Sequence, residues 1–370
     1  MSLRSIAHGL GMRVSSAAAI AVAASLLSAS PAAAQAVPAD LTVMPPVPTT
    51  YQPKKTSWGD PDLRGTWPID NIASLPMNRP AQFGNRFWLN DEENAARLAQ
   101  AARSDAAYAA EDKSGKMGMG HWVESDASGR RTNLLVSPAN GQLPPMTDAA
   151  QALYKAGRSS WTPNTKYNWV TDFDSWDRCV SRGFPASMFP FRYNNGIRVF
   201  QSPGYVVIQL EMLGTRVIPI AKAGSGAGAW PQGVEGWLGR SVGHWEGNTL
   251  VIETTNLKTG DSAATDTARR NGSPLNMATL GVPPFNTIPT SAQAKVVERL
   301  TPTGADSIVY EATYSDPEVF TAPWTARLDW TRNDSYEFYE YACHEGNVQV
   351  RNYISSSRAG TQPVRTEGAE

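Results

Sequence analysis

The chain has 370 residues, with 33 Lys and Arg against 34 Asp and Glu and a formal net charge of −1. A chain of this length can bury a large hydrophobic core, and a near-neutral charge gives no electrostatic footprint for nucleic acid or for an anionic membrane surface. No Walker A sequence and no Gly-x-Gly-x-x-Gly fingerprint occurs, which argues against kinases, ATPases and soluble dehydrogenases. We therefore expect no nucleotide or other cofactor.

The first 34 residues have the organisation of a secretory signal peptide. Arg4 and Arg13 supply positive charge, Val14 to Ala29 is uncharged and apolar, and Pro31 to Ala34 supplies the small residues read by signal peptidase. The alternative is a membrane anchor, but the apolar core is shorter than the roughly 20 residues that span a bilayer. We expect cleavage after Ala34, a mature chain in the periplasm, and no membrane span after cleavage.

Residues 35–57 are rich in Pro and Thr and predict an extended leader, and residues 58–370 predict one domain. In its first part, 58–196, coil and short helices are expected to wrap over the rest. A helix is predicted over 91–108 with Asp91 as its N-cap, and a second over 147–156 with Thr147 as its N-cap. Residues 260–289 predict a long loop rich in Gly and Pro.

From Ile197 onward, short runs rich in Val, Ile, Thr and Tyr alternate with turn residues such as Gly247-Asn248. This pattern predicts a mainly β fold over 197–347, followed by a C-terminal tail at 348–370. We expect an antiparallel, lipocalin- or calycin-like β-barrel of about eight or nine strands that can enclose one ligand. The predicted strands are 197–201, 205–212, 215–220, 239–246, 249–256, 295–301, 307–315, 325–332 and 335–343.

The two cysteines, Cys179 and Cys343, predict one disulfide in an oxidising compartment. A reactive thiol is the alternative, although no Cys-x-x-Cys spacing supports it. The disulfide would hold the end of the last predicted strand, where His344 and Glu345 follow Cys343. These two residues are candidate catalytic groups, and a capping turn is the structural alternative.

Three further residues are candidate acids or bases on strands. Glu253 and Glu211 lie in apolar runs, and His244 precedes the run that contains Glu253. A carboxyl that faces the interior acquires a raised pKa and suits general acid–base work, whereas one that faces outward is an ordinary solvated side chain. A zinc site made by His121, His244 and His344 with Glu345 or Glu253 is a further alternative, but their spacing matches no local metal motif, and we expect no metal.

A cation, a phenol and two amides occur together just before the first strand, in Arg192, Tyr193, Asn194 and Asn195. Such a loop at a barrel mouth can hold an oxygen-rich aromatic ligand by hydrogen bonds and stacking. Arg240 and Tyr339 complete the predicted substrate-binding set. An Asn-rich turn is the structural alternative for this loop.

Several blocks of this sequence resemble a large family of secreted bacterial proteins from Proteobacteria and Acidobacteria, most of them uncharacterised. In that family we expect Asp at the position of Asn248. At 137–140 we expect Asp-Pro-Pro-Asp, where this chain has Ser-Pro-Ala-Asn. The resemblance implies a secreted protein but lends little about activity, and the likeness to ligand-binding barrels is one of fold alone. The matching blocks are 60–67, 131–136, 141–145, 178–183, 193–195, 201–207, 245–256, 297–299 and 339–347.

These observations predict a periplasmic, cofactor-independent lyase or hydrolase that acts on an aromatic small molecule. One version is retro-aldol cleavage of a lignin-derived aromatic dimer with release of formaldehyde. It needs a base, for which Glu253 or His244 is the candidate, and groups that stabilise developing charge, for which Arg192, Tyr193 and Arg240 are candidates. The alternatives are a module that binds an apolar or aromatic ligand without chemistry, and an envelope scaffold with a filled barrel. The oligomeric state stays open.

Overall fold

The computed structural model describes residues 37–73, 75–115, 129–156, 166–191, 193–221, 233–258 and 288–360. The predicted signal peptide, almost all of the predicted 260–289 loop, Arg192 and His121 lie outside these residues. Within them, no helix combines the length and apolarity needed to cross a membrane.

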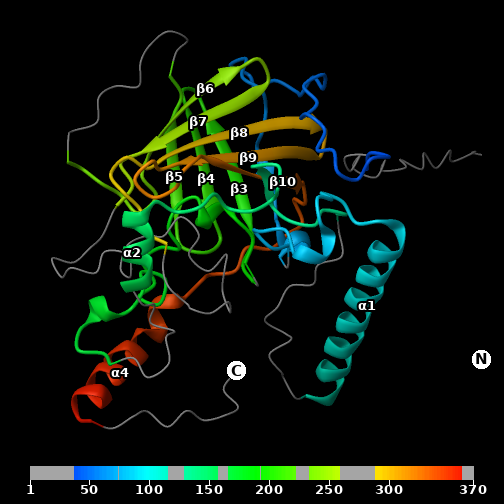
Figure 1. Cartoon of the computed structure of the whole chain (residues 1–370). Coiled ribbons are helices and arrows are strands. Elements are labelled where there is room, and N and C mark those ends of the chain that lie inside the picture. Colours follow the sequence, from blue (N-terminus) through cyan, green and yellow to red (C-terminus); the bar gives the residue numbers. More distant parts are fainter. Residues whose placement is uncertain are drawn as a thin grey trace, which may run out of the picture. The chain divides into compact units, whose positions relative to one another are not determined.

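The described residues form two antiparallel sheets, with strands of one crossing over strands of the other (Figure 1). The mainly β, antiparallel character predicted from the sequence is confirmed. The four-stranded sheet has the order β1-β3-β4-β5, with β1 (Gly65–Thr66), β3 (Ile197–Ser202), β4 (Tyr205–Leu210) and β5 (Thr215–Pro219). The six-stranded sheet has the order β2-β10-β9-β8-β7-β6, with β2 (Leu135–Ser137), β6 (Arg240–Glu246), β7 (Thr249–Thr255), β8 (Lys295–Gly304), β9 (Ser307–Ser315) and β10 (Trp324–Thr331).

One hydrophobic core takes side chains from both sheets. On β9, Ile308, Tyr310, Ala312 and Tyr314 occupy alternate positions, and each is at most 1 % exposed. The residues between them are Val309, Glu311 and Thr313. The two tyrosines stack on tryptophans of β10. Tyr310 stacks on Trp330 with ring centroids 4.9 Å apart, and Tyr314 stacks on Trp324 with ring centroids 5.2 Å apart. The alternation seen in the sequence therefore marks the buried face of this strand.

The two sheets approach one another at both ends of the strand order. A parallel bridge joins Ile220, just after β5, to Gly243 in β6. At the other end, the backbone N–H of Asn333 donates to the carbonyl of Thr66 in β1 at 2.9 Å. These contacts connect two separate sheets, and closure into a lipocalin-like barrel stays a prediction.

The helices differ from expectation in one cap. Helix α1 (Asp91–Ser114) extends beyond the predicted 91–108, and its N-cap is Asn90. Asn90 Oδ1 accepts from the N–H of Glu93 at 2.8 Å while Glu93 Oε2 accepts from the N–H of Asn90 at 2.9 Å, a capping box. Asp91 instead pairs with Arg130 at 2.7 Å. Helix α2 (Asp148–Ala156) begins as predicted, since Thr147 Oγ1 accepts from the N–H of Ala150 at 3.2 Å.

The predicted last strand, 335–343, is wrong. Asn333 Oδ1 accepts from the N–H of Ser335 at 3.1 Å, and the N–H of Tyr336 donates to the carbonyl of Asn333, so a turn redirects the chain after β10. The segment then runs without ladder pairing into a 3-10 helix, η6 (Cys343–Asn347), and into helix α4 (Val348–Arg358), which occupies part of the predicted tail. The other 3-10 helices of the described residues are η1 (Asp70–Ile72), η2 (Ala81–Phe83), η4 (Val170–Asp172) and η5 (Ala186–Met188).

Candidate functional site

Glu211 lies directly after β4 and is only 7 % exposed. Its two carboxylate oxygens accept four hydrogen bonds. Oε2 accepts from the N–H of Gly196 at 2.9 Å and from the Tyr336 hydroxyl at 2.8 Å. Oε1 accepts from Asn194 Nδ2 and from the N–H of Tyr339, both at 3.1 Å. A buried carboxylate thus joins the loop before β3 to the segment after β10.

The loop before β3 adopts its shape through its two asparagines. Asn194 has φ +54°, a left-handed conformation that Asn tolerates better than most residues, and from it the side chain reaches Glu211. Asn195 is buried, and its side-chain amide bonds both the N–H and the carbonyl of Phe191, at 2.7 and 2.6 Å. The carbonyl of Asn195 accepts from the N–H of Ile69, which brings η1 to the site.

A second carboxyl, that of Asp70, lies at the start of η1. Burial raises the pKa of Asp70, and the nearby negative charge of Glu211 raises it further, against hydrogen bonds from the local backbone that lower it. The two carboxyl groups thus lie within electrostatic range of one another, and carboxyl groups are frequent general acids and bases.

Arg182 places a positive charge inside the protein, on the loop that follows Cys179. It is 3 % exposed, lies over the Phe191 ring at 4.8 Å, and donates from Nη1 to the carbonyl of Phe189 at 3.1 Å. Its Nε and Nη2 have no hydrogen-bond acceptor within the described part of the chain. Burial lowers the pKa of Arg182 to about 10, so the group stays a cation at neutral pH.

Two phenols, Tyr193 and Tyr341, lie within electrostatic range of Arg182. Burial raises the pKa of Tyr341, and its contact with Tyr193 raises it further. Tyr341 therefore stays protonated near neutral pH and can donate a hydrogen bond. Arg182 and the two phenols thus form a second group of polar side chains, beside the carboxyl groups of Asp70 and Glu211 as separate candidates.

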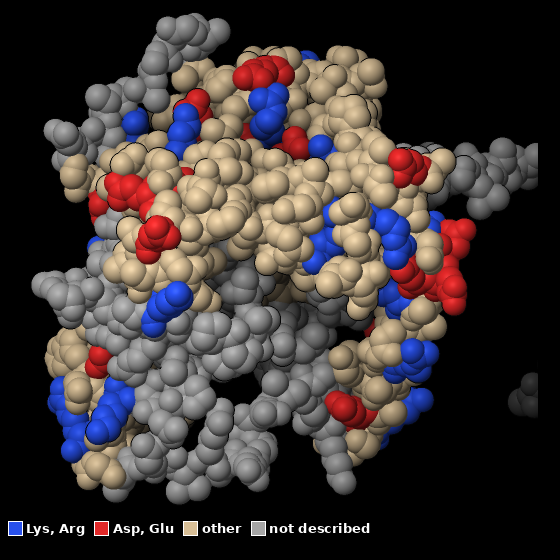
Figure 2. Space-filling model, in the orientation of Figure 1, with Lys and Arg blue, Asp and Glu red and all other residues tan. Residues whose placement is uncertain are grey.

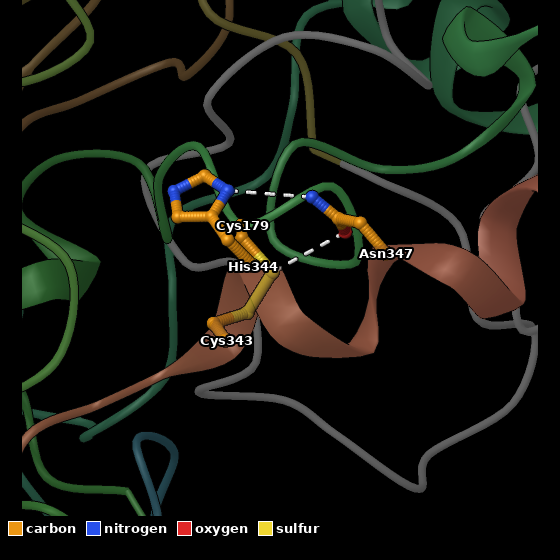
Figure 3. Close-up of a disulfide and its surroundings, with 4 residues drawn as sticks. All are labelled: Cys179, Cys343, His344 and Asn347. Carbon is orange, nitrogen blue, oxygen red and sulfur yellow. Dashed lines mark hydrogen bonds between the residues drawn. A yellow bond between two sulfur atoms is a disulfide. The ribbon is translucent and has the colours of Figure 1, made fainter.

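A disulfide joins Cys179 and Cys343, as the sequence predicted, with a Cα–Cα distance of 5.6 Å (Figure 3). It connects the loop that carries Arg182 to the segment that carries Tyr339 and Tyr341. Figure 3 shows His344 beside the disulfide, with its Nδ1 3.3 Å from Asn347 Nδ2. His344 and Glu345 are both exposed on η6.

Glu253 and His244 do not face the core. Glu253 forms an ion pair with Lys295 at 2.6 Å, with the two side chains 49 % and 42 % exposed. His244 is half-buried and lies 3.3 Å from the exposed Glu246. The inward positions of β7 are instead held by Ile252 and Thr254, which are fully buried. Glu253 therefore lacks the burial that its predicted catalytic role requires.

Of the other predicted substrate-binding residues, Tyr339 contacts Glu211 through its backbone alone, and Arg240 lies on a different strand from the one that Glu211 follows. Tyr339 contributes its backbone N–H to Glu211, while its side chain is 68 % exposed. Arg240 begins β6 and is half-buried. Within the described ranges no three His, Cys, Asp or Glu side chains gather as a metal site would need.

One motif bears on the hydrolase alternative. Gly239-Arg-Ser-Val-Gly243 has the Gly-x-Ser-x-Gly spacing of a nucleophile elbow, which requires a sharp turn between a strand and a helix. Here Ser241 lies inside β6, and its hydroxyl is buried, 2.8 Å from Thr254 Oγ1 and 2.9 Å from Arg216 Nη2. Ser241 therefore belongs to the core and is not a nucleophile.

Sequence reasoning missed Asp70, Arg182, Tyr336 and Tyr341. Asp70 and Arg182 come from the segment expected only to wrap the sheets. Arg182 had one usable signal, its place three residues after a predicted half-cystine. The tyrosines were assigned to a strand that does not form.

In comparisons with known proteins, no family model, no curated protein and no solved structure matches this chain. The resemblance to a family of secreted bacterial proteins stays a prediction.

Proposed function

We propose that this protein is a cofactor-independent acid–base enzyme that acts on an aromatic small molecule. Two observations support this most: burial raises the pKa of Asp70, with a further contribution from the charge of Glu211, and the buried Glu211 accepts four hydrogen bonds. In this proposal Asp70 transfers the proton. Glu211 acts as a positioning residue that orients Tyr336 and the backbone around it.

Arg182 is the proposed electrostatic partner of the reaction. A buried cation with two unused donors stabilises negative charge as it develops on a substrate. Burying this charge lowers the stability of the folded protein before any substrate binds. The nearby phenols of Tyr193 and Tyr341 can add hydrogen bonds to the same charge. These groups take the place of Glu253 and His244, which lie on the outer face of their sheet.

The proposed reaction is retro-aldol cleavage of an aromatic compound that carries a hydroxymethyl group on its benzylic carbon, as in a lignin-derived dimer. Asp70 takes the hydroxyl proton, the oxygen forms the carbonyl of formaldehyde, and the carbon–carbon bond breaks. Its electron pair stays on the benzylic carbon, which receives the proton back from Asp70. Atoms and charge balance without an oxidant or a reductant.

A module that binds an aromatic ligand without chemistry is the second candidate. The saturation of Glu211 by four donors favours it, because such bonding is also what a purely structural carboxylate requires. For either function we propose export by the N-terminal signal peptide, and periplasmic residence. The disulfide is consistent with an oxidising compartment.

The test uses the mature chain from Gln35, incubated with a panel of aromatic dimers and esters, with formaldehyde and organic products followed by mass spectrometry. We expect turnover that falls at least about 100-fold in Asp70→Asn. Glu253→Gln serves as the matched control and should retain full turnover. Ligand that stays on the protein through gel filtration without product would favour the binding module, and undiminished turnover in Asp70→Asn would remove Asp70 from the mechanism.

A further inference from the structure

A groove of about 510 Å³ lies between helix α4 and the segment that contains η4. This volume is in the range of roughly 300–1,000 Å³ that small-molecule pockets occupy. The groove shares no residue with the Glu211 and Arg182 region. Its lining consists of Trp169, Val170, Arg178, Asn347, Val350, Arg351, Ile354, Ser355 and Arg358.

One wall of the groove is a single face of α4. Arg351, Ile354 and Arg358 follow one another at spacings of three and four residues and therefore lie on the same side of the helix, with Val350 beside them. The disulfide fixes the start of this wall, because α4 follows η6 without a break.

The lining is strongly positive, with three arginines and no Asp or Glu. Figure 2 shows Lys and Arg side chains gathered over α4, at the lower left. Arg351 is exposed, and no hydrogen bond or ion pair joins it to another described residue. A guanidinium group such as that of Arg351 can bind a carboxylate in the bidentate manner.

The opposite wall carries an exposed aromatic ring. Trp169 is 61 % exposed, an unusual state for the largest apolar side chain, and Val170 beside it is 40 % exposed. Arg358 lies 5.8 Å from the Trp169 ring and donates to the carbonyl of Asn168, so the indole is held at the edge of the groove. A planar ligand can stack on this ring while its charge meets the arginines.

We propose that this groove binds an aromatic carboxylate, with Arg351 as the principal contact of the carboxylate and Trp169 as the stacking surface for the ring. Guanidinium groups supply the affinity for the anion, and the exposed indole supplies the preference for an aromatic ring over an aliphatic one. The inference does not rest on the enzymatic proposal, and an absence of turnover would leave it unaffected.

The test measures the affinity of the mature chain by isothermal titration calorimetry. The three probes are 4-hydroxybenzoate, its methyl ester and cyclohexanecarboxylate. We expect 4-hydroxybenzoate to bind, and both other probes to bind at least about tenfold more weakly, since each lacks one of the two contacts. Equal affinity for the acid and its ester would overturn the proposal, as would no detectable binding of the acid at millimolar concentration.

Variants locate the binding. Arg351→Ala should weaken 4-hydroxybenzoate at least about tenfold, and Trp169→Ala should remove the preference over cyclohexanecarboxylate. Arg103→Ala, an exposed arginine on α1, is the matched control and should bind as the unsubstituted chain does. Unchanged binding in Arg351→Ala, or an equal loss in Arg103→Ala, would exclude this groove as the site.

Discussion

Arg216 and Glu298 form an ion pair inside the core, with Nη1–Oε1 and Nη2–Oε2 distances of 2.8 and 2.5 Å and side chains that are 2 % and 0 % exposed. Arg216 belongs to β5 and Glu298 to β8, so the pair connects the two sheets. The Tyr310 hydroxyl also donates to Glu298 at 2.9 Å, and the Phe184 ring lies 4.4 Å from the guanidinium.

Removing one charge of this pair should destabilise the protein strongly. Glu298→Gln leaves the Arg216 cation buried without its counter-charge, and we expect a loss of about 3–5 kcal/mol in the free energy of unfolding. Urea denaturation followed by fluorescence measures it. Glu253→Gln in β7 breaks an exposed pair with Lys295 and should cost less than about 1 kcal/mol. Similar losses in the two variants would contradict the contrast between buried and exposed pairs.

The disulfide should contribute substantially to stability. It joins residues 164 positions apart, and the chain-entropy model assigns a loop of that size roughly 4–5 kcal/mol. Replacing both Cys179 and Cys343 by Ala should therefore lower the urea midpoint markedly. Reductant should destabilise the native chain toward the same value and leave the double variant unaffected. A native chain that is indifferent to reductant would show that the crosslink does not contribute.

Asp70 should make stability depend on pH in a defined direction. Because its folded pKa is raised above the usual 3.8, its contribution to stability is fully present below pH 3.8 and is lost as the pH rises through the folded pKa. Asp70→Asn removes the charge that burial and Glu211 disfavour. The variant should be more stable than the native chain at pH 7, and this advantage should shrink as the pH falls toward 3.8. Denaturation curves across this range test the sign, and an advantage that grows on acidification would refute it.

Gly196 should tolerate no side chain. A Cβ there would lie 2.7 Å from Glu211 Oε2 and from Phe338 Cε2, and 2.8 Å from Tyr336 Cε1. Relief of these contacts would displace the hydrogen bonds around Glu211, so Gly196→Ala should cost about 1–3 kcal/mol and reduce any turnover. Gly346→Ala is the control, since nothing lies within 4 Å of its added Cβ, and we expect a change within about 0.5 kcal/mol.

Much of the fold could be predicted from the sequence because it is encoded locally. Turn residues such as Gly247-Asn248 lie between β-branched runs, and strands β3 to β10 form at or within two or three residues of the predicted ranges. The disulfide was predicted from there being two cysteines behind a predicted secretory signal peptide. The final predicted strand failed because its alternating aromatic residues resemble a strand, whereas the turn at Asn333 and the carboxylate of Glu211 direct that segment elsewhere.

The candidate site depended on contacts that a local pattern does not carry. In β7, Val251 and Ile252 are both apolar, so the pattern alone could not assign Glu253 to the inner or the outer face; the neighbouring strands decide it. Glu211 meets Tyr336 from 125 residues away, and Arg216 meets Glu298 from 82. The sequence by itself determined strands β3 to β10, the turns between them and the crosslink, because these follow from short-range propensity and chemistry. Only the tertiary structure decided which charges are buried together. That depends on how the two sheets pack against each other and bring residues that are distant in the sequence into contact.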